Sequence, residues 1–117
     1  MTAGLYNTTI EQGARYDRTI TWYDKDGNLV DLRTYTARAH YRNHHADDDI
    51  ILELTTGNGG IVLGGLLGTI QLLATTAQTT ALPAEAFGVW DLEMVDAAGE
   101  ADRLLEGAFS ITPEVTR

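Results

Sequence analysis

The stretch "GVWDLEMV", residues 88–95, alternates apolar and acidic side chains with a period of two. In an extended chain Trp90, Leu92 and Met94 share one face, and the two acidic residues between them share the other. Such an alternation is typical of a strand that buries one face and leaves the other in water. The stretch therefore predicts a half-buried β-strand with an acidic outer face.

The same period recurs along the chain. In "YTARAHYR" (35–42), Ala37, Ala39 and Tyr41 alternate with polar residues, and in "RYDRTITWY" (15–23) the apolar phase ends at Trp22. Together with residues 88–95, these patterns predict about seven strands. Further strand-like runs lie at 50–54, 60–63, 69–74 and 103–111.

Glycine-containing turns between these runs predict that neighbouring strands are mainly antiparallel. One short helix is expected in "TTAQTTALP" (75–83), where Thr75 and Gln78 have the spacing of a capping box and Pro83 prevents continuation. We therefore predict an all-β fold: a single antiparallel, immunoglobulin-like β-sandwich over residues 1–117, with about seven strands and one short helix. The turns are "DKDGN" (24–28), "TGNGG" (56–60), "LGGLLG" (63–68) and "DAAGE" (96–100).

Composition excludes several functional classes. The 117 residues include no Cys, which excludes disulfides, thiol catalysis and cysteine-ligated zinc. A net charge of -9 opposes binding to nucleic acid. No apolar run approaches the length of a membrane span, and the N-terminal residues lack the pattern of a secretory signal, so we expect no membrane association.

The charge is uneven along the chain. Residues 1–42 hold six basic and five acidic residues, whereas residues 43–117 hold two basic and twelve acidic ones. Ordinary solubility explains such a surplus of acid, and the alternative is that oppositely charged faces meet between subunits.

No catalytic or cofactor-binding motif emerges. Ser110, the only serine, lies inside a strand-like run without the glycines of a nucleophile elbow. The glycine of "DKDGN" comes too early for a calcium loop, and "GNGGIVLGG" runs into a strand and lacks a phosphate-binding lysine. We therefore expect a protein that is not an enzyme and needs no cofactor.

The stretch "RNHHADDDI" (42–50) has the composition of a metal site. Neighbouring histidines diverge in an extended chain, and the stretch falls between two predicted strands. A metal site would need two or three of these side chains to converge or a second subunit to complete the set, so we expect a solvated hairpin loop without metal. The candidate ligands are His44, His45, Asp47, Asp48 and Asp49.

Two further expectations concern apolar residues. Trp22, Trp90, Leu92 and Phe109 lie on the apolar phases of their strands, so we expect them to meet between the sheets. Leu66 and Leu67 lie in a turn between glycines, where polar residues are usual. Either one leucine folds back onto the sandwich, or the pair contacts a neighbouring subunit.

The order of these segments resembles a class of small proteins encoded among the virion structural genes of tailed bacteriophages and prophages. The resemblance covers nearly the whole chain, and its elements are core alternation and turn residues. A looser resemblance to the N-terminal β-sandwich domain of phage baseplate upper proteins involves Asp31, Leu32, Tyr35, Thr36 and Ala37. The matching segments are residues 10–42, 52–64, 68–83 and 88–117.

The resemblance implies a non-enzymatic virion protein of the tail or baseplate. It would contact other virion proteins, form a homo-oligomer or ring in the particle, and be present in the host cytoplasm during assembly. Head decoration and head-to-tail connection are alternatives. The looser relative has a long C-terminal extension with the receptor-binding or fibre-docking part, which these 117 residues do not include, so the resemblance gives no expectation of direct host recognition.

A carbohydrate- or host-surface-binding module is another alternative. Aromatic side chains can form a stacking platform for a sugar. The residues available for such a platform are Trp22, Tyr23, Tyr41 and Trp90.

Overall fold

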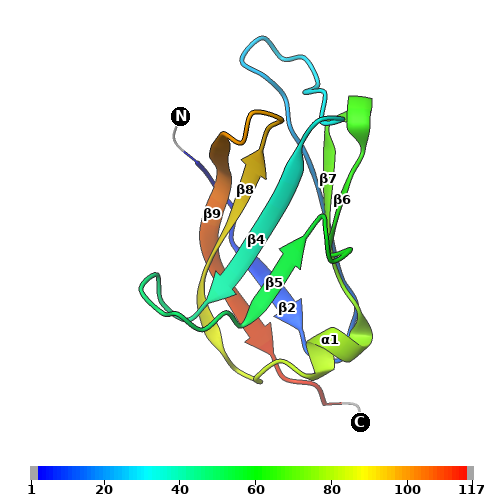
Figure 1. Cartoon of the computed structure of the whole chain (residues 1–117). Helices are drawn as coiled ribbons and strands as arrows, with labels where there is room; N and C mark the ends of the chain where they lie inside the picture. Colours follow the sequence, from blue (N-terminus) through cyan, green and yellow to red (C-terminus); the bar gives the residue numbers. More distant parts are fainter. Residues whose placement is uncertain (1–2, 116–117) are drawn as a thin grey trace.

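The computed structural model describes residues 3–115 and consists of two β-sheets packed face to face (Figure 1). Nine strands, one 3-10 helix and one α-helix form this part of the chain. In chain order they are β1 (Gly4–Leu5), β2 (Thr8–Glu11), β3 (Tyr16–Thr21), β4 (Thr36–Arg42), β5 (Leu52–Thr55), β6 (Ile61–Leu63), η1 (Gly65–Leu67), β7 (Thr69–Ala74), α1 (Thr76–Thr80), β8 (Phe87–Val95) and β9 (Ala101–Thr112).

The larger sheet has the strand order β1-β9-β8-β4-β5, and β2 also pairs with β9. The smaller sheet has the order β3-β7-β6. The chain therefore crosses between the sheets after β2, β3, β5 and β7, whereas β4-β5, β6-β7 and β8-β9 are consecutive strands that pair within one sheet. All pairings are antiparallel except those of β1 and β2, which run parallel to β9.

The seven strands predicted from the sequence are all present, and β7 has the predicted bounds of residues 69–74. β1 and β2 were not predicted. They are two and four residues long, too short for alternation to stand out from chance. They exist because the edge of β9 offers backbone partners to a chain already lying beside it.

An aromatic cluster around Tyr41 forms the centre of the core. The ring of Tyr41 stacks on Trp90 at 5.4 Å and meets the ring of Phe109 edge-on at the same distance. Its hydroxyl lies 3.2 Å from that of Tyr16, which in turn hydrogen-bonds Thr8 at 3.0 Å. Because Tyr16 belongs to the smaller sheet and Tyr41 to the larger, this hydrogen bond joins the two sheets across the core.

Three of the four residues expected to meet between the sheets lie in the core. Trp90, Leu92 and Phe109 are buried. Trp22 is only partly buried and packs edge-on against Tyr35 at 5.7 Å between ring centres, so it lies apart from Trp90. The expectation failed because β3 ends at Thr21, and Trp22 belongs to the connection that leaves the sheet.

Helix α1 closes the opposite end of the sandwich from η1 (Figure 1). The Thr75 hydroxyl accepts a hydrogen bond from the Gln78 backbone N–H, and the Gln78 side chain accepts one from the Thr75 N–H, as the sequence predicted. The buried Thr79 hydroxyl donates to the Ala14 carbonyl at 2.9 Å. This bond ties the helix to the turn between β2 and β3. No helix among residues 3–115 is long and apolar enough to cross a membrane.

The predicted turns serve different purposes. "DAAGE" joins the paired strands β8 and β9, and Gly99 within it has a positive φ of 86°. "DKDGN" folds back within the long connection from β3 to β4, where Tyr23 and Leu29 form an isolated antiparallel bridge. "TGNGG" carries the chain from one sheet to the other. A sequence signal for a turn does not state which strands the turn will join.

Replacing Trp90 with Ala should lower the free energy of unfolding by about 3 to 5 kcal/mol, because the large cavity left beside Tyr41 cannot collapse. The change also removes the 2.7 Å hydrogen bond from the Trp90 indole Nε1 to the Tyr6 carbonyl. Denaturant unfolding measures the loss, with Trp90→Phe as the control that retains a ring. A fully stable Trp90→Ala variant would contradict this account of the core.

Candidate protein-interaction site

The turn between β6 and β7 projects two leucines from one end of the sandwich. It forms the 3-10 helix η1, which begins at Gly65 and is followed by Gly68, with positive φ values of 61° and 67° at these two glycines. A Cβ on Gly68 would lie 3.0 Å from the Trp22 carbonyl oxygen, so the turn approaches its neighbour too closely for a side chain there. Leu66 and Leu67 remain 60% and 65% exposed, so neither folds back onto the sandwich.

Hydrogen bonds from two other segments hold the backbone of this turn. The Leu32 N–H donates to the Gly65 carbonyl at 3.0 Å, and the Trp22 N–H donates to the Gly68 carbonyl at 2.8 Å. A backbone bonded at both ends of η1 loses little further freedom when its side chains bind a partner. The two leucines are therefore presented on a fixed support.

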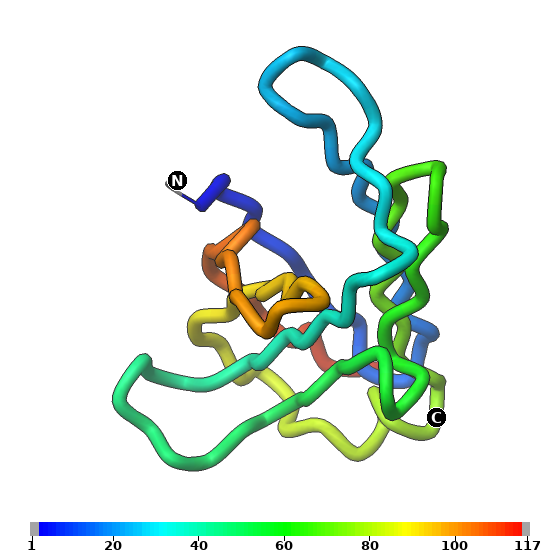
Figure 2. The backbone as a smooth tube through the Cα atoms, turned by 45° about the horizontal axis from the view of Figure 1, so that its top comes forward, coloured from blue at the N-terminus to red at the C-terminus, as the bar shows by residue number. Residues whose placement is uncertain are grey.

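Two more apolar side chains are exposed at the same end. Tyr23 and Leu29 lie opposite each other at the base of the "DKDGN" turn. The segment 22–35 and η1 lie at this end in both views of the backbone (Figure 2). We call Tyr23, Leu29, Leu66 and Leu67 the apolar end. Exposed large apolar side chains that gather at one place are typical of contact surfaces.

The outer face of the larger sheet is charged. Its registers place Glu53, His40, Asp91 and Glu106 in one row across β5, β4, β8 and β9, and Arg38, Glu93 and Arg103 in the next row. We call these residues the charged face.

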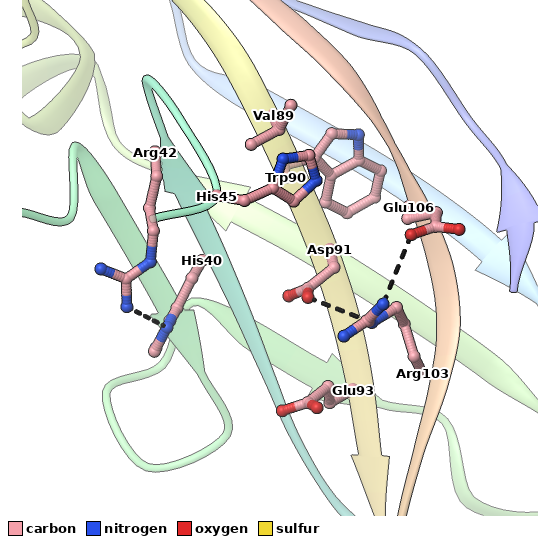
Figure 3. A pocket seen from close by; sticks show the side chains of 9 residues that line it. All are labelled: His40, Arg42, His45, Val89, Trp90, Asp91, Glu93, Arg103 and Glu106. Atoms are coloured by element: carbon pink, nitrogen blue, oxygen red, sulfur yellow. Dashed lines mark hydrogen bonds and ion pairs between the residues drawn. The ribbon is translucent and has the colours of Figure 1, made fainter. Parts of the chain in front are cut away.

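Ion pairs join charged residues within each row and between the two rows. Arg38 pairs with Glu93 at 2.8 Å, and His40 approaches Glu53 at 2.8 Å. Arg103 lies between Asp91 at 3.3 Å and Glu106 at 3.5 Å (Figure 3). A depression of about 320 Å³ on this face is lined by these side chains together with Arg42, His45, Val89 and Trp90.

Asp91 is a partly buried carboxylate on this face. Partial burial raises the pKa of its carboxyl above the ordinary value of 3.8, and the nearby Glu93 and Glu106 raise it further, against the lowering effect of Arg103 and His40. The folded state therefore binds a proton at Asp91 more tightly than the unfolded chain does.

The charged face also accounts for the uneven charge along the sequence. β4 comes from the basic first part of the chain and lies between β5 and β8 from the acidic second part. Arg38 thereby meets Glu93 within one molecule. Part of the charge asymmetry is thus matched between neighbouring strands without a second subunit.

The "HHADDD" loop joins the paired strands β4 and β5, as the sequence predicted. His44 lies 3.3 Å from Asp47, whereas His45 lies beside Val89 and Trp90 and lines the depression on the charged face (Figure 3). The Arg42 guanidinium donates to the carbonyls of residues 47 and 48 and so fixes the loop backbone. Within residues 3–115, no three His, Asp or Glu side chains gather closely enough to hold a metal ion.

The four aromatic residues considered as a sugar platform do not share a surface. Tyr41 and Trp90 are buried in the core, and Trp22 is half-buried against Tyr35. Tyr23 is exposed. A platform needs several ring faces open to one ligand, and this chain exposes one of the four.

Comparison with solved structures identifies the class to which the fold belongs. The chain superposes on the extracellular domain of the voltage-gated sodium channel β4 subunit with a TM-score of 0.52 at 10% identity, covering 98% of this chain and 97% of that one. The fold is immunoglobulin-like. The sodium-channel domain is described as forming parallel homodimers with a role in cell-cell adhesion.

Two further structures are similar at lower scores. Murine CRIg matches with a TM-score of 0.41, 11% identity and 92% coverage of both chains. Domains 3–5 of Drosophila OTK match with a TM-score of 0.38 and 13% identity, covering 97% of this chain and 33% of that one. No family model and no curated protein sequence matches the chain.

Replacing Asp91 with Asn should stabilise the protein at neutral pH, because the folded state then no longer holds an ionised carboxylate at a partly buried position. The pKa is raised, so the stability that wild-type Asp91 contributes is present below pH 3.8 and is lost as the pH rises through the folded pKa. Loss of the exposed ion pair to Arg103 opposes the gain only weakly.

Denaturant unfolding of the wild type and Asp91→Asn at pH 7 and at about pH 3 measures this effect. The advantage of the variant should be present at pH 7 and should shrink in acid. A variant that is less stable than the wild type at pH 7 would show that the ion pair with Arg103 outweighs the cost of burial.

Addition of a strong chelator should leave the melting temperature unchanged, because the histidines of the "HHADDD" loop point to different partners. Differential scanning calorimetry with and without chelator measures this. A fall of several degrees that one particular divalent ion reverses would demonstrate a metal site in the loop.

Proposed function

We propose that this chain is a non-enzymatic structural protein of a tailed-bacteriophage particle, located in the tail or baseplate and assembled through repeated protein-protein contacts. The observation that carries the proposal is the apolar end, where Leu66 and Leu67 are exposed on a backbone fixed by neighbouring segments. The resemblance of the sequence to virion structural proteins supplies the biological setting. An immunoglobulin-like fold agrees with a binding role but does not specify the partner.

Burial of the leucines at the apolar end supplies a modest free energy for each contact. Burial of both leucines contributes roughly 3 to 6 kcal/mol per contact before the cost of association is subtracted. Contacts of this size are weak singly and become strong when a ring or tube repeats them. The fixed backbone of η1 keeps the entropic cost of each contact low.

The charged face supports a non-catalytic role. Arg103 is engaged by two carboxylates, and Arg38 and His40 each have an acidic partner. An acid/base catalyst instead needs a titratable group poised for a substrate. The raised pKa of Asp91 is explained by burial and by neighbouring carboxylates on the same sheet.

Head decoration and head-to-tail connection would use the same apolar end. The number of copies per particle separates these positions, because a tail or baseplate ring holds few copies and a decorated head holds many. Mass spectrometry of denatured particles reads this number. A sugar-binding module is less well supported, because Tyr41 and Trp90 lie in the core.

Changing Leu66 and Leu67 together to Ser should leave the isolated protein folded, because both side chains project into solvent. Incorporation into particles should fall strongly, because the partner surface loses its apolar contact. The matched control is Phe87→Ser, which removes a side chain that is 74% exposed at the start of β8. Circular dichroism confirms folding, and the chain content of purified particles measures incorporation.

Wild-type incorporation of the Leu66→Ser, Leu67→Ser variant would show that the apolar end is not the assembly contact. Equal loss with Phe87→Ser would indicate that any exposed apolar residue matters and that η1 has no special role. Absence of the wild-type chain from purified particles would contradict the virion assignment itself.

A further inference from the structure

The outer edge of β6 carries unpaired backbone groups. Hydrogen bonds join Gly64 N–H to the Thr69 carbonyl and Leu73 N–H to the Gly60 carbonyl. In an antiparallel ladder bonded and non-bonded residues alternate, so Val62 bonds toward β7 whereas Ile61 and Leu63 direct their N–H and C=O groups away from it. Within residues 3–115, no hydrogen bond reaches these outward groups.

The neighbouring edge strand, β5, is closed by a side chain. The Asn58 amide oxygen accepts from the Thr55 N–H at 2.9 Å, and the amide nitrogen donates to the Glu53 carbonyl at 3.0 Å. These are the groups that an added strand would use. Asn58 therefore occupies the edge of the larger sheet in place of another strand.

The other edge of the smaller sheet, β3, carries the charged side chain of Arg18. The Arg18 guanidinium donates to the Asp17 carbonyl at 3.0 Å and to the Thr9 carbonyl at 2.9 Å, and it lies over the Tyr16 ring. Charged residues on an edge strand oppose pairing with another chain. Thus Asn58 closes the edge of β5 and Arg18 places a charge at the start of β3, whereas within residues 3–115 no side chain bonds the outward backbone groups of β6.

The open edge lies in an uncharged stretch of the sequence. Residues 54–84 contain no Asp, Glu, Lys, Arg or His, although the whole chain has a net charge of -9. Val62, in the middle of β6, is 48% exposed on the outer face of the sheet. β6 lies at the margin of the sandwich with its outer side uncovered by another element (Figure 1).

We propose that the edge of β6 binds the β6 edge of a second copy of this chain, forming an antiparallel pair centred on Val62. In this arrangement Ile61 of each copy lies opposite Leu63 of the other, and about four backbone hydrogen bonds form. The smaller sheets of the two molecules then join into one continuous sheet.

Charge favours a second copy as the occupant. Two molecules of net charge -9 repel each other over most of their surfaces, and the uncharged segment is where this repulsion is least. A twofold pair also places Val62 beside Val62, an apolar cross-strand contact without like charges. A basic partner protein would gain no such advantage from an uncharged edge.

The pair involves the edge of the sheet and leaves the apolar end free for another contact, so this inference goes beyond the proposed function. A three-residue strand gives a small interface, which implies a weak dimer that forms at high protein concentration or within an assembly. Its test uses the isolated protein, whereas the test of the apolar end uses particles. Failure of one is therefore distinguishable from failure of the other.

Sedimentation equilibrium across the micromolar to millimolar range should detect a reversible dimer of the wild type. Val62→Lys should be monomeric, because it places two like charges side by side at the centre of the pair. Val62→Thr, which keeps a neutral β-branched side chain, should still dimerise. Thr19→Lys is the matched control, since it adds the same charge to an exposed position on β3.

A charge-swap mixture identifies the register. Val62→Lys and Val62→Glu should each be monomeric alone and should form a mixed dimer when combined, because Val62 faces its own counterpart. Hydrogen exchange adds a backbone readout: the amides of Ile61 and Leu63 should gain protection with rising protein concentration, while that of Val62 is already protected by β7.

Three outcomes would overturn the proposal. They are a wild type that remains monomeric at millimolar concentration, a Val62→Lys variant that dimerises like the wild type, and a dimer that Thr19→Lys disrupts equally. Each is read from protein whose circular dichroism confirms folding.

Discussion

The contact between Tyr16 and Tyr41 joins the two sheets at the centre of the core. Antibody domains join their sheets with a disulfide, and this chain has no cysteine. Here a 3.2 Å hydrogen bond between the two hydroxyls crosses the core, and the Tyr41 ring stacks on Trp90. Burial raises the pKa of the Tyr41 phenol well above its ordinary value, so the hydroxyl stays neutral and able to hydrogen-bond. The rest of the sandwich is arranged around this aromatic centre.

A core fixed in this way leaves the ends and edges of the sandwich to serve for binding. The backbone of η1 is bonded to the connection that follows β3, so Leu66 and Leu67 are exposed without being loose. The edges also differ: Asn58 closes β5, Arg18 places a charge at the start of β3, and within residues 3–115 no side chain bonds the outer groups of β6. Since the core is complete within one molecule, an exposed apolar or unpaired group at these places is available for contacts between molecules.

The position of β4 in the larger sheet shows how topology redistributes charge. In sequence the first 42 residues are slightly basic and the remainder strongly acidic. In the sheet β4 lies between two acidic strands, and Arg38 pairs with Glu93. Along the sequence, the basic first part and the acidic remainder suggest complementary faces on two subunits. In the folded chain, part of this opposite charge is instead neutralised within one molecule. The pKa of Asp91 is raised mainly by partial burial, and neighbouring carboxylates on the same face raise it further.

The sequence by itself determined the strands with strong alternation and the capping box at Thr75, because each depends on residues close together in the chain. It left open whether one leucine of η1 folds back, and the structure shows both exposed. The sequence did not determine β1, β2 or the place of Trp22, because these depend on where β9 and the end of β3 lie in space. Only the tertiary structure decided which edges are closed. Whether Ile61 and Leu63 are unpaired depends on the phase of the β6-β7 ladder and on which side chains reach each edge, and both are set by contacts between segments distant in sequence.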